Sequence, residues 1–178
     1  AETATRHVGN CQICEGDQKL HGGRMVHHGY RRPGDGFIHG DCPGVGHVPY
    51  EVSCDLVKRH IVDLGRFIKD RQDWLRRLQG GAVTELYVQE YRGSGRRESV
   101  KVVAGTPEAD KYDLSHGCTL WERALGAAVH NAESDIRFAQ GDVVRCERRV
   151  AAWRPLPVRT VEEEQRKADT GRAERQAV

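Results

Sequence analysis

The sequence predicts an α+β protein: a small N-terminal zinc-binding module followed by a long antiparallel helical hairpin, coiled-coil-like, with a β-hairpin inserted between the helices. Three observations predict this fold class. Closely spaced cysteines occur in a histidine- and glycine-rich start, two later stretches repeat apolar residues every three or four positions, and two β-like runs lie between those stretches. Aromatic residues make up only 6% of the chain and charged residues 30%. Such a composition favours a thin core supported by metal or paired helices over a thick α/β sandwich.

Residues 1–50 are the predicted zinc-binding module. Glycines and prolines recur from Gly9 to Pro49, which favours turns and short hairpins over helix. Six of the nine histidines also lie here: His7, His21, His27, His28, His39 and His47. A segment so poor in large apolar side chains cannot close a core unaided. Bound metal is the most economical explanation.

Four residues are the predicted ligands of a structural Zn²⁺ ion: Cys11, Cys14, His28 and Cys42. A Cys-x-x-Cys turn directs two sulfurs at one ion, and structural zinc sites use four Cys or His ligands in tetrahedral geometry. Cys42 precedes Pro-Gly, which is typical of a second knuckle. His28 stands midway, with thirteen residues separating it from Cys14 and thirteen from Cys42.

The fourth ligand is open to alternatives. Cys54 is the main rival of His28, because the first turn of a helix could present it as in treble-clef fingers. The other candidates are His27, His39 and His47. A redox or disulfide role for the Cys-x-x-Cys pair is disfavoured, because redox motifs follow an apolar strand and none precedes Cys11. Cys118 and Cys146 are assigned to packing on the second helix.

The module also resembles a group of uncharacterised bacterial and phage proteins. The resemblance is carried by Met25-Val-His-His-Gly-Tyr-Arg-Arg-Pro-Gly34, by Asp41-Cys-Pro-Gly-Val-Gly46 and by Pro49-Tyr-Glu51, after the Cys-x-x-Cys start. It covers mainly residues 11–55, and weakly residues 150–155. The resemblance implies that His28 and Cys42 are ligands and makes Cys54 less favoured. It implies no activity.

Residues 51–155 are the predicted helix, β-hairpin and helix domain. An a/d-type apolar stripe is expected to form the first helix and to end at Gly80-Gly81: Val57, Ile61, Leu64, Ile68, Leu75 and Leu78. Strands are predicted at 83–91 and 98–103, around a basic glycine-rich tip. A second helix is predicted over 114–153, with a kink or break at Gly126 or Gly141. Residues 156–178 are expected to be a charged, mobile tail.

The motif inventory argues against an enzyme. The sequence contains no His-Glu-x-x-His, no His-x-Glu, no Pro-Cys-x-x-Cys and no Gly-x-x-x-x-Gly-Lys string. Catalytic zinc also needs an open position and a general base, and no motif supplies them. A zinc-dependent enzyme is therefore the least favoured alternative. The absence of an apolar run of about 18–20 residues predicts no membrane association, and the lack of a signal-like start predicts a cytoplasmic location.

Binding is the predicted mode of action. We expect a non-enzymatic zinc-finger accessory protein of bacterial or phage origin whose partner is a protein complex, such as transcription or host-defence machinery. The net charge of only +2 gives little long-range attraction to nucleic acid. Direct nucleic-acid binding is the alternative, and its candidate residues are Tyr30, Arg31, Arg32, Arg96 and Arg97. The apolar stripes could also pair two copies of the chain as a homodimer.

Overall fold

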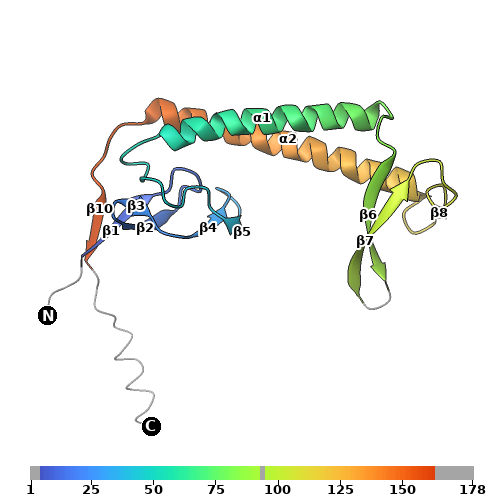
Figure 1. Cartoon of the computed structure of the whole chain (residues 1–178), viewed down its shortest axis with the longest axis horizontal. Coiled ribbons are helices and arrows are strands. Elements are labelled where there is room, and N and C mark those ends of the chain that lie inside the picture. Colours follow the sequence, from blue (N-terminus) through green and yellow to red (C-terminus); the bar gives the residue numbers. More distant parts are fainter. Residues whose placement is uncertain (1–4, 93–94, 163–178) are drawn as a thin grey trace, which may run out of the picture. The chain divides into compact units, whose positions relative to one another are not determined.

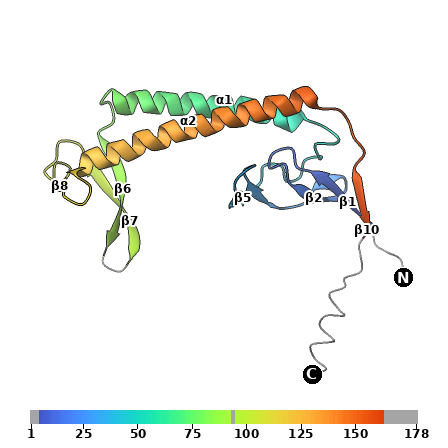
Figure 2. The same cartoon turned by 180° about the vertical axis from the view of Figure 1, so that it is seen from behind.

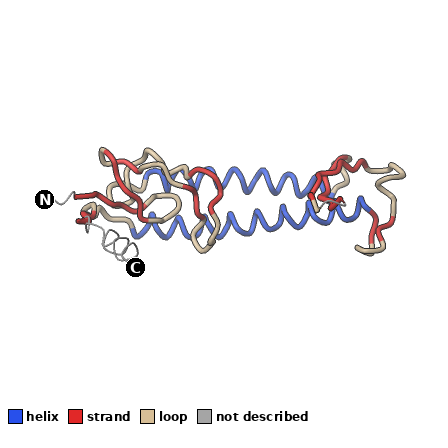
Figure 3. Tube along the Cα trace, turned by 90° about the horizontal axis from the view of Figure 1, so that it is seen from below, coloured by secondary structure: helices blue, strands red, loops and turns tan. Residues whose placement is uncertain are grey.

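The computed structural model describes residues 5–92 and 95–162, which form two helices and several small antiparallel sheets (Figure 1). The helices are α1 (Asp55–Gln79) and α2 (Leu120–Ala152). The strands of the first part are β1 (Thr5–Asn10), β2 (Asp17–His21), β3 (Arg24–Met25), β4 (Gly29–Arg31) and β5 (Ile38–Asp41). Later strands are β6 (Glu85–Arg92), β7 (Arg96–Val103), β8 (Tyr112–Asp113), β9 (Cys118–Thr119) and β10 (Arg159–Glu162). Figure 3 shows that short strands and loops make up most of the chain outside the two helices.

The predicted fold class is wrong: the described residues do not form a long helical hairpin with an inserted β-hairpin. A coiled coil would bury its apolar stripe continuously. Along α1 the stripe residues Leu64 and Ile68 are only half-buried, while Val62 and Phe67 are 54% and 42% exposed. Full burial occurs near the two ends of the helix instead. Periodicity correctly located the helix but not its partners, because the same stripe can face a helix, a sheet or partial solvent.

The chain divides by its contacts into two compact units. One unit comprises residues 1–61 and 146–178, and the other comprises residues 62–145. Each helix therefore contributes residues to both units. The sequence predicted domain boundaries after residues 50 and 155. The division by contacts does not test these boundaries, so they stay predictions.

The first unit contains a four-stranded antiparallel sheet in the order β10-β1-β2-β3 and a separate β4–β5 pair. Strand β10 pairs with β1 from Thr5↔Glu162 to Val8↔Arg159, and Figure 2 shows the two strands side by side. The segment that contains β10 was expected to belong to a mobile tail. The rest of that predicted tail, residues 163–178, lies outside the described residues.

A second cluster of the first unit joins the start of α1 to the end of α2. Cys54, Val57 and Cys146 are buried there, with Tyr50, Ile61, Val150 and Trp153 packed around them. The Tyr50 hydroxyl donates to the Arg149 carbonyl over 2.6 Å, and the Trp153 indole N–H donates to the Tyr50 carbonyl over 2.6 Å. These bonds satisfy the polar ends of two aromatic side chains that are otherwise packed.

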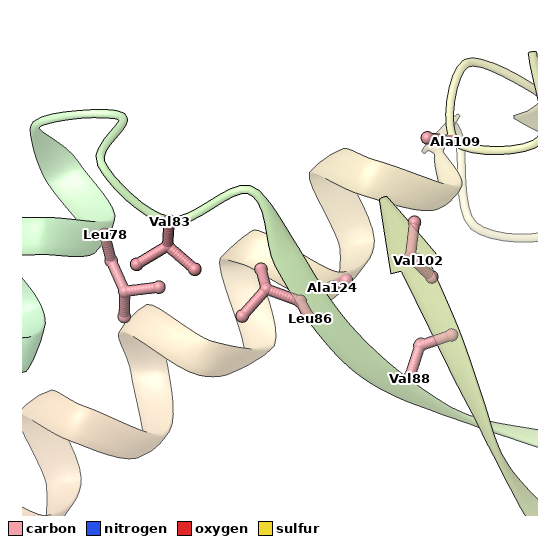
Figure 4. Close-up of a cluster of buried hydrophobic side chains, with 7 residues drawn as sticks. All are labelled: Leu78, Val83, Leu86, Val88, Val102, Ala109 and Ala124. Atoms are coloured by element: carbon pink, nitrogen blue, oxygen red, sulfur yellow. The ribbon is translucent and has the colours of Figure 1, made fainter. Parts of the chain in front are cut away.

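The second unit has its core between the C-terminal end of α1, the β6–β7 pair and the first turns of α2 (Figure 4). Its buried side chains are Leu78, Val83, Leu86, Val88, Val102, Ala109 and Ala124. Strands β6 and β7 pair antiparallel from Glu85↔Val103 to Arg92↔Arg96, close to the strand positions predicted from sequence. Alternation along β6 directs Leu86 and Val88 into this core.

Local chemistry explains where the helices begin and end. Helix α1 ends where Gly81 adopts a left-handed φ of 72°, and the Ala82 N–H donates to the Arg77 carbonyl over 3.0 Å. Helix α2 begins with a capping box: the Glu122 N–H donates to Thr119 Oγ1 over 3.1 Å, and the Thr119 N–H donates to Glu122 Oε2 over 2.8 Å. The helix starts later than predicted because residues 112–119 form the β8–β9 ribbon. It runs unbroken past Gly126 and Gly141.

Candidate metal centre

The Cys11–Cys14 segment folds as a tight turn directly after β1. The Glu15 N–H donates to the Cys11 carbonyl over 3.1 Å, and the Cys11 N–H donates to the Gly16 carbonyl over 2.9 Å. Glu15 closes the turn with a φ of 60°, an unusual conformation for a residue with a side chain. Both cysteine side chains are buried in one cluster with Ile13 and Met25.

Cys42 begins a second turn directly after β5. The Val45 N–H donates to the Cys42 carbonyl over 3.1 Å, and the Gly44 N–H donates to Cys42 Sγ over 3.4 Å. A Cβ atom at position 44 would lie 2.2 Å from Cys11 Sγ. Glycine is therefore required at position 44, because its bare backbone lets the two turns approach each other.

The two turns and the segment before β4 bring four candidate ligands together. The ligand atoms of Cys11, Cys14, His28 and Cys42 all lie within 4.8 Å of one another, and they could hold a metal ion. Cys11 Sγ and Cys42 Sγ are 3.7 Å apart. Two sulfurs at about 2.3 Å from one ion and at a tetrahedral angle would be about 3.8 Å apart. The observed separation is compatible with zinc.

The His28 ring is oriented as a metal ligand would be. Its Nδ1–H donates to the Val26 carbonyl over 2.8 Å, so Nε2 is the ring nitrogen that could bind a metal ion. Nε2 is buried and has no hydrogen-bond partner among the described residues. A buried acceptor without a partner is costly, and a metal ion would satisfy it. A backbone hydrogen bond on the other ring nitrogen is the usual support of a ligating histidine.

The three thiols differ in their tendency to ionise. A hydrogen bond from the Cys42 thiol lowers the pKa of Cys11 to about 4, and the same bond raises the pKa of Cys42. Burial raises the pKa of Cys14. Without a cation the hydrogen bond from Cys42 therefore stabilises the thiolate form of Cys11. A bound cation would replace the remaining thiol protons.

The other candidate ligands lie elsewhere. Cys54 is buried in the cluster with Val57 and Cys146, and it is not a member of the four-residue group. His27 and His39 form exposed pairs with Asp41 and Asp35, over 2.9 and 3.2 Å. The backbone N–H of His47 donates to the Gly44 carbonyl over 3.2 Å, and His47 is not a member of the four-residue group. Cys118 lies on β9 and not on the second helix as predicted.

Two further residues fix the first turn, and sequence reasoning missed both. Gln12, between the two cysteines, is almost fully buried; its Nε2 donates to the Val48 carbonyl over 2.8 Å. Arg149 of α2 donates from Nη1 to the Gln12 carbonyl over 2.7 Å. Its guanidinium carbon also lies 4.4 Å from the centre of the Tyr50 ring. A polar residue inside a knuckle and an arginine on a helix carry no sequence signal of such contacts.

The predicted nucleic-acid residues fall in both units. In the first unit Tyr30 is half-buried against the cysteine cluster, and Arg31 is exposed beside it on β4. Arg32 follows and is half-buried. In the second unit Arg96 and Arg97 are exposed on β7, where the Arg97 side chain donates to Tyr91 Oη over 2.6 Å. Their role in nucleic-acid binding stays a prediction.

A Ser–His–Asp group in the second unit has a different geometry from a catalytic triad. Asp113 accepts from Ser115 and from His116 Nδ1, and Ser115 Oγ also lies 2.8 Å from His116 Nδ1. A nucleophile relay needs the serine and the acid on opposite ring nitrogens. Here both contact the same nitrogen, so the group serves to close the turn between β8 and β9.

No family model, no curated protein and no solved structure matches this chain. The resemblance to bacterial and phage knuckle proteins therefore stays a proposal. Within the described residues, neither helix combines the length and the apolar character that a membrane crossing requires.

Proposed function

We propose that Cys11, Cys14, His28 and Cys42 bind one structural Zn²⁺ ion, and that the protein acts by binding a macromolecular partner and not by catalysis. The single observation that supports this best is the buried His28 Nε2, which lacks a hydrogen-bond partner and lies within ligand distance of three thiols. The three sulfurs and one imidazole nitrogen form a donor set that zinc prefers in tetrahedral sites. Hard cations such as Mg²⁺ and Ca²⁺ select oxygen donors instead.

A structural role is favoured over a catalytic one. The protein supplies all four tetrahedral positions, so none is left for water or substrate. A cavity of about 300 Å³ adjoins the centre, and its lining residues are Cys14, Gly16, Gln18, His28, Gly29, Arg31 and Ile38. None of these is a carboxylate that could act as a general base beside the metal. Gln12 and Arg149, in contrast, connect the first turn to the two helices, as a supporting site requires.

Elemental analysis of untagged protein tests the metal assignment. We expect about one zinc per chain, lost in Cys11→Ser and Cys42→Ser and weakened in His28→Ala. Cys54→Ser is the matched control, because Cys54 is equally buried but packs in another cluster. Retained zinc in His28→Ala together with lost zinc in Cys54→Ser would reverse the choice of fourth ligand. Metal-free protein with full structure would reject the metal centre.

The proposed partner is a protein, and the outward face of β6 and β7 is its best-supported binding surface. Tyr87 and Tyr91 are 65% and 68% exposed on the face opposite Leu86 and Val88. Lys101 is the cross-strand neighbour of Tyr87, and Arg97 is the neighbour of Tyr91. Tyrosine and arginine are among the residues that dominate binding energy at protein interfaces, which favours the end of this face where Arg97 lies beside Tyr91.

A pull-down from the native host, with and without nuclease, tests the partner class. A protein partner should survive nuclease treatment and be lost in Tyr87→Ala and Tyr91→Ala. Tyr112→Ala is the matched control, because Tyr112 is also exposed in the same unit but lies on β8. Leu86→Ala is unsuitable as an interface variant, since Leu86 is a core residue. If Tyr87→Ala and Tyr91→Ala capture the partner as well as Tyr112→Ala does, the outward face of β6 and β7 is not the binding surface.

A further inference from the structure

A second surface, in the first unit, carries a concentration of basic side chains. A cavity of about 360 Å³ is lined by Arg6 and His7 of β1, by Lys19, Leu20 and His21 of β2, and by Val26. Four of these six residues carry a cation or a protonatable imidazole, and none carries a carboxylate. We call this surface the basic groove.

Strand geometry explains why these side chains meet. Val8 of β1 pairs with Lys19 of β2. Arg6 lies two residues before Val8 on β1, and His21 lies two residues after Lys19 on β2. Because the strands are antiparallel, both residues lie toward the same end of the pair. Because side chains alternate between the faces of a strand, Arg6, Lys19 and His21 share one face of the sheet.

The groove has the two properties that bind a sugar–phosphate chain. Lys19 and His21 are exposed on this face and form no ion pair with another described residue, so their N–H groups are available to oxygen acceptors. His7, the neighbour of Arg6 on β1, alternates to the opposite face and is not counted among these donors. Val26, whose N–H donates to the Lys19 carbonyl over 3.2 Å, is half-buried and adds apolar surface beside these donors. Cationic donors suit phosphate oxygens, and the apolar part suits a ribose or deoxyribose ring.

We propose that the basic groove binds the backbone of a single-stranded nucleic acid. Alternate residues of one strand, such as Lys19 and His21, are about 7 Å apart. That spacing is comparable to the separation of successive phosphates in an extended single strand, so neighbouring donors can contact neighbouring phosphates. An extended acidic peptide reaches this repeat only where every second residue is acidic, whereas every nucleotide of a single strand carries a phosphate.

This inference goes beyond the proposed protein partner, which binds the other unit. It rests on the proposed zinc site in one respect: Leu20 packs against the cysteine cluster, so the groove requires a folded module. The groove is also distinct from the arginine pairs predicted from sequence. Arg31, Arg32, Arg96 and Arg97 do not line it.

Fluorescence anisotropy of the full-length, zinc-loaded chain with a labelled single-stranded oligonucleotide tests the proposal. Binding should weaken steeply between about 50 and 200 mM salt, because each phosphate contact releases counterions. Lys19→Ala should reduce the slope of log Kobs against log salt by about 0.7, the expectation for one lost contact with a single strand. Lys19→Glu should lower affinity more than tenfold.

Lys58→Ala is the matched control, because it removes an exposed lysine of the same unit that does not line the groove. It should bind as the wild type does. Equal loss in Lys58→Ala, or unchanged binding by Lys19→Glu, would overturn the proposal. Tighter binding to a duplex or to an acidic peptide, with the same dependence on Lys19, would replace the proposed ligand. No binding by the wild type at low salt would reject the groove as a nucleic-acid site.

Zinc content separates this failure from failure of the metal site. Each groove variant should keep the wild-type zinc content and far-UV spectrum, because the substituted side chains are exposed. Loss of binding with zinc retained therefore reports on the groove alone. Absence of zinc from the wild type would reject the metal centre, whatever the oligonucleotide result.

Discussion

Gln12 Oε1 accepts a hydrogen bond from the backbone N–H of Leu56 over 2.9 Å. The N–H groups in the first turn of a helix have no partner within the helix. Gln12 therefore caps α1 from a position 44 residues away in the sequence. Ser53 Oγ accepts from the neighbouring Asp55 N–H over 3.1 Å, so the residue between two candidate metal ligands shares the capping of the first helix with Ser53.

Gln12→Ala should destabilise the first unit. The substitution removes both the acceptor for Leu56 and the donor to the Val48 carbonyl, and it leaves those backbone groups without partners. We expect a loss of about 2 kcal/mol in the free energy of unfolding. Urea unfolding followed by circular dichroism measures it. Gln140→Ala, at an exposed site on α2, should change stability by less than about 0.5 kcal/mol.

Arg149→Lys should destabilise the protein although it keeps the charge. Arg149 donates to the Gln12 carbonyl, stacks on the Tyr50 ring and lies 3.6 Å from Glu15 Oε1. A lysine ammonium cannot reproduce this planar arrangement. We expect a loss of about 1–3 kcal/mol by thermal or urea unfolding. Arg148→Lys, at the exposed neighbouring position, is the control; comparable losses in the two variants would contradict the assigned role.

Leu78→Ala should cost more stability than Leu64→Ala. Leu78 is 2% exposed in the core of the second unit, whereas Leu64 is half-buried. We expect Leu78→Ala to cost about 3–5 kcal/mol, and Leu64→Ala to cost less than about 2 kcal/mol. Equal costs would indicate that the α1 stripe is buried continuously, as the coiled-coil prediction required. Light scattering at increasing concentration would show whether a homodimer covers Leu64.

Removal of the metal should make the backbone amides of the first unit, and not those of the second, exchange faster with solvent. Besides the cysteines, the cluster that supports these strands holds only a few apolar and aromatic side chains among the described residues: Ile13, Leu20, Met25, Tyr30, Val45 and Leu56. A strong chelator should therefore abolish hydrogen-exchange protection in β1 to β5. Protection in β6 and β7, which pack in a metal-free core, should persist. Undiminished protection of β1 and β2 in protein shown to be zinc-free would contradict a structural role for the metal.

Acid should weaken the contribution of Asp113 to stability. Hydrogen bonds from Ser115 and His116 lower the pKa of Asp113 to about 2 from 3.8. Because the folded-state pKa is depressed, the stabilisation is complete above pH 3.8 and is lost as the pH falls through about 2. The stability difference between wild type and Asp113→Asn should shrink over this range. A difference that stays constant from pH 5 to 2 would contradict the network.

The four candidate metal ligands could be proposed from sequence because their chemistry is carried by residue type and spacing. The fold class could not. A heptad stripe reports which residues of a helix are apolar, but not what covers them, and along α1 Leu64 and Ile68 are only half covered. The capping box at Thr119 and Glu122 was readable and would have placed the start of α2 correctly. The contact between Gln12 and Arg149 could not be predicted from the sequence, because it joins residues 137 positions apart.

The pairing of β1 with β10 sets the order in which the protein can be completed on the ribosome. Residues 62–145 are continuous, so the second unit can fold as soon as that stretch has left the exit tunnel. The first unit includes a strand from Thr5–Asn10 and another from Arg159–Glu162. Its cysteine turns emerge before the second unit, whereas β10 emerges after it. The nascent chain therefore carries its cysteine turns through the synthesis of the second unit before β10 can complete their sheet, and capture of a metal ion would hold those turns together in that interval.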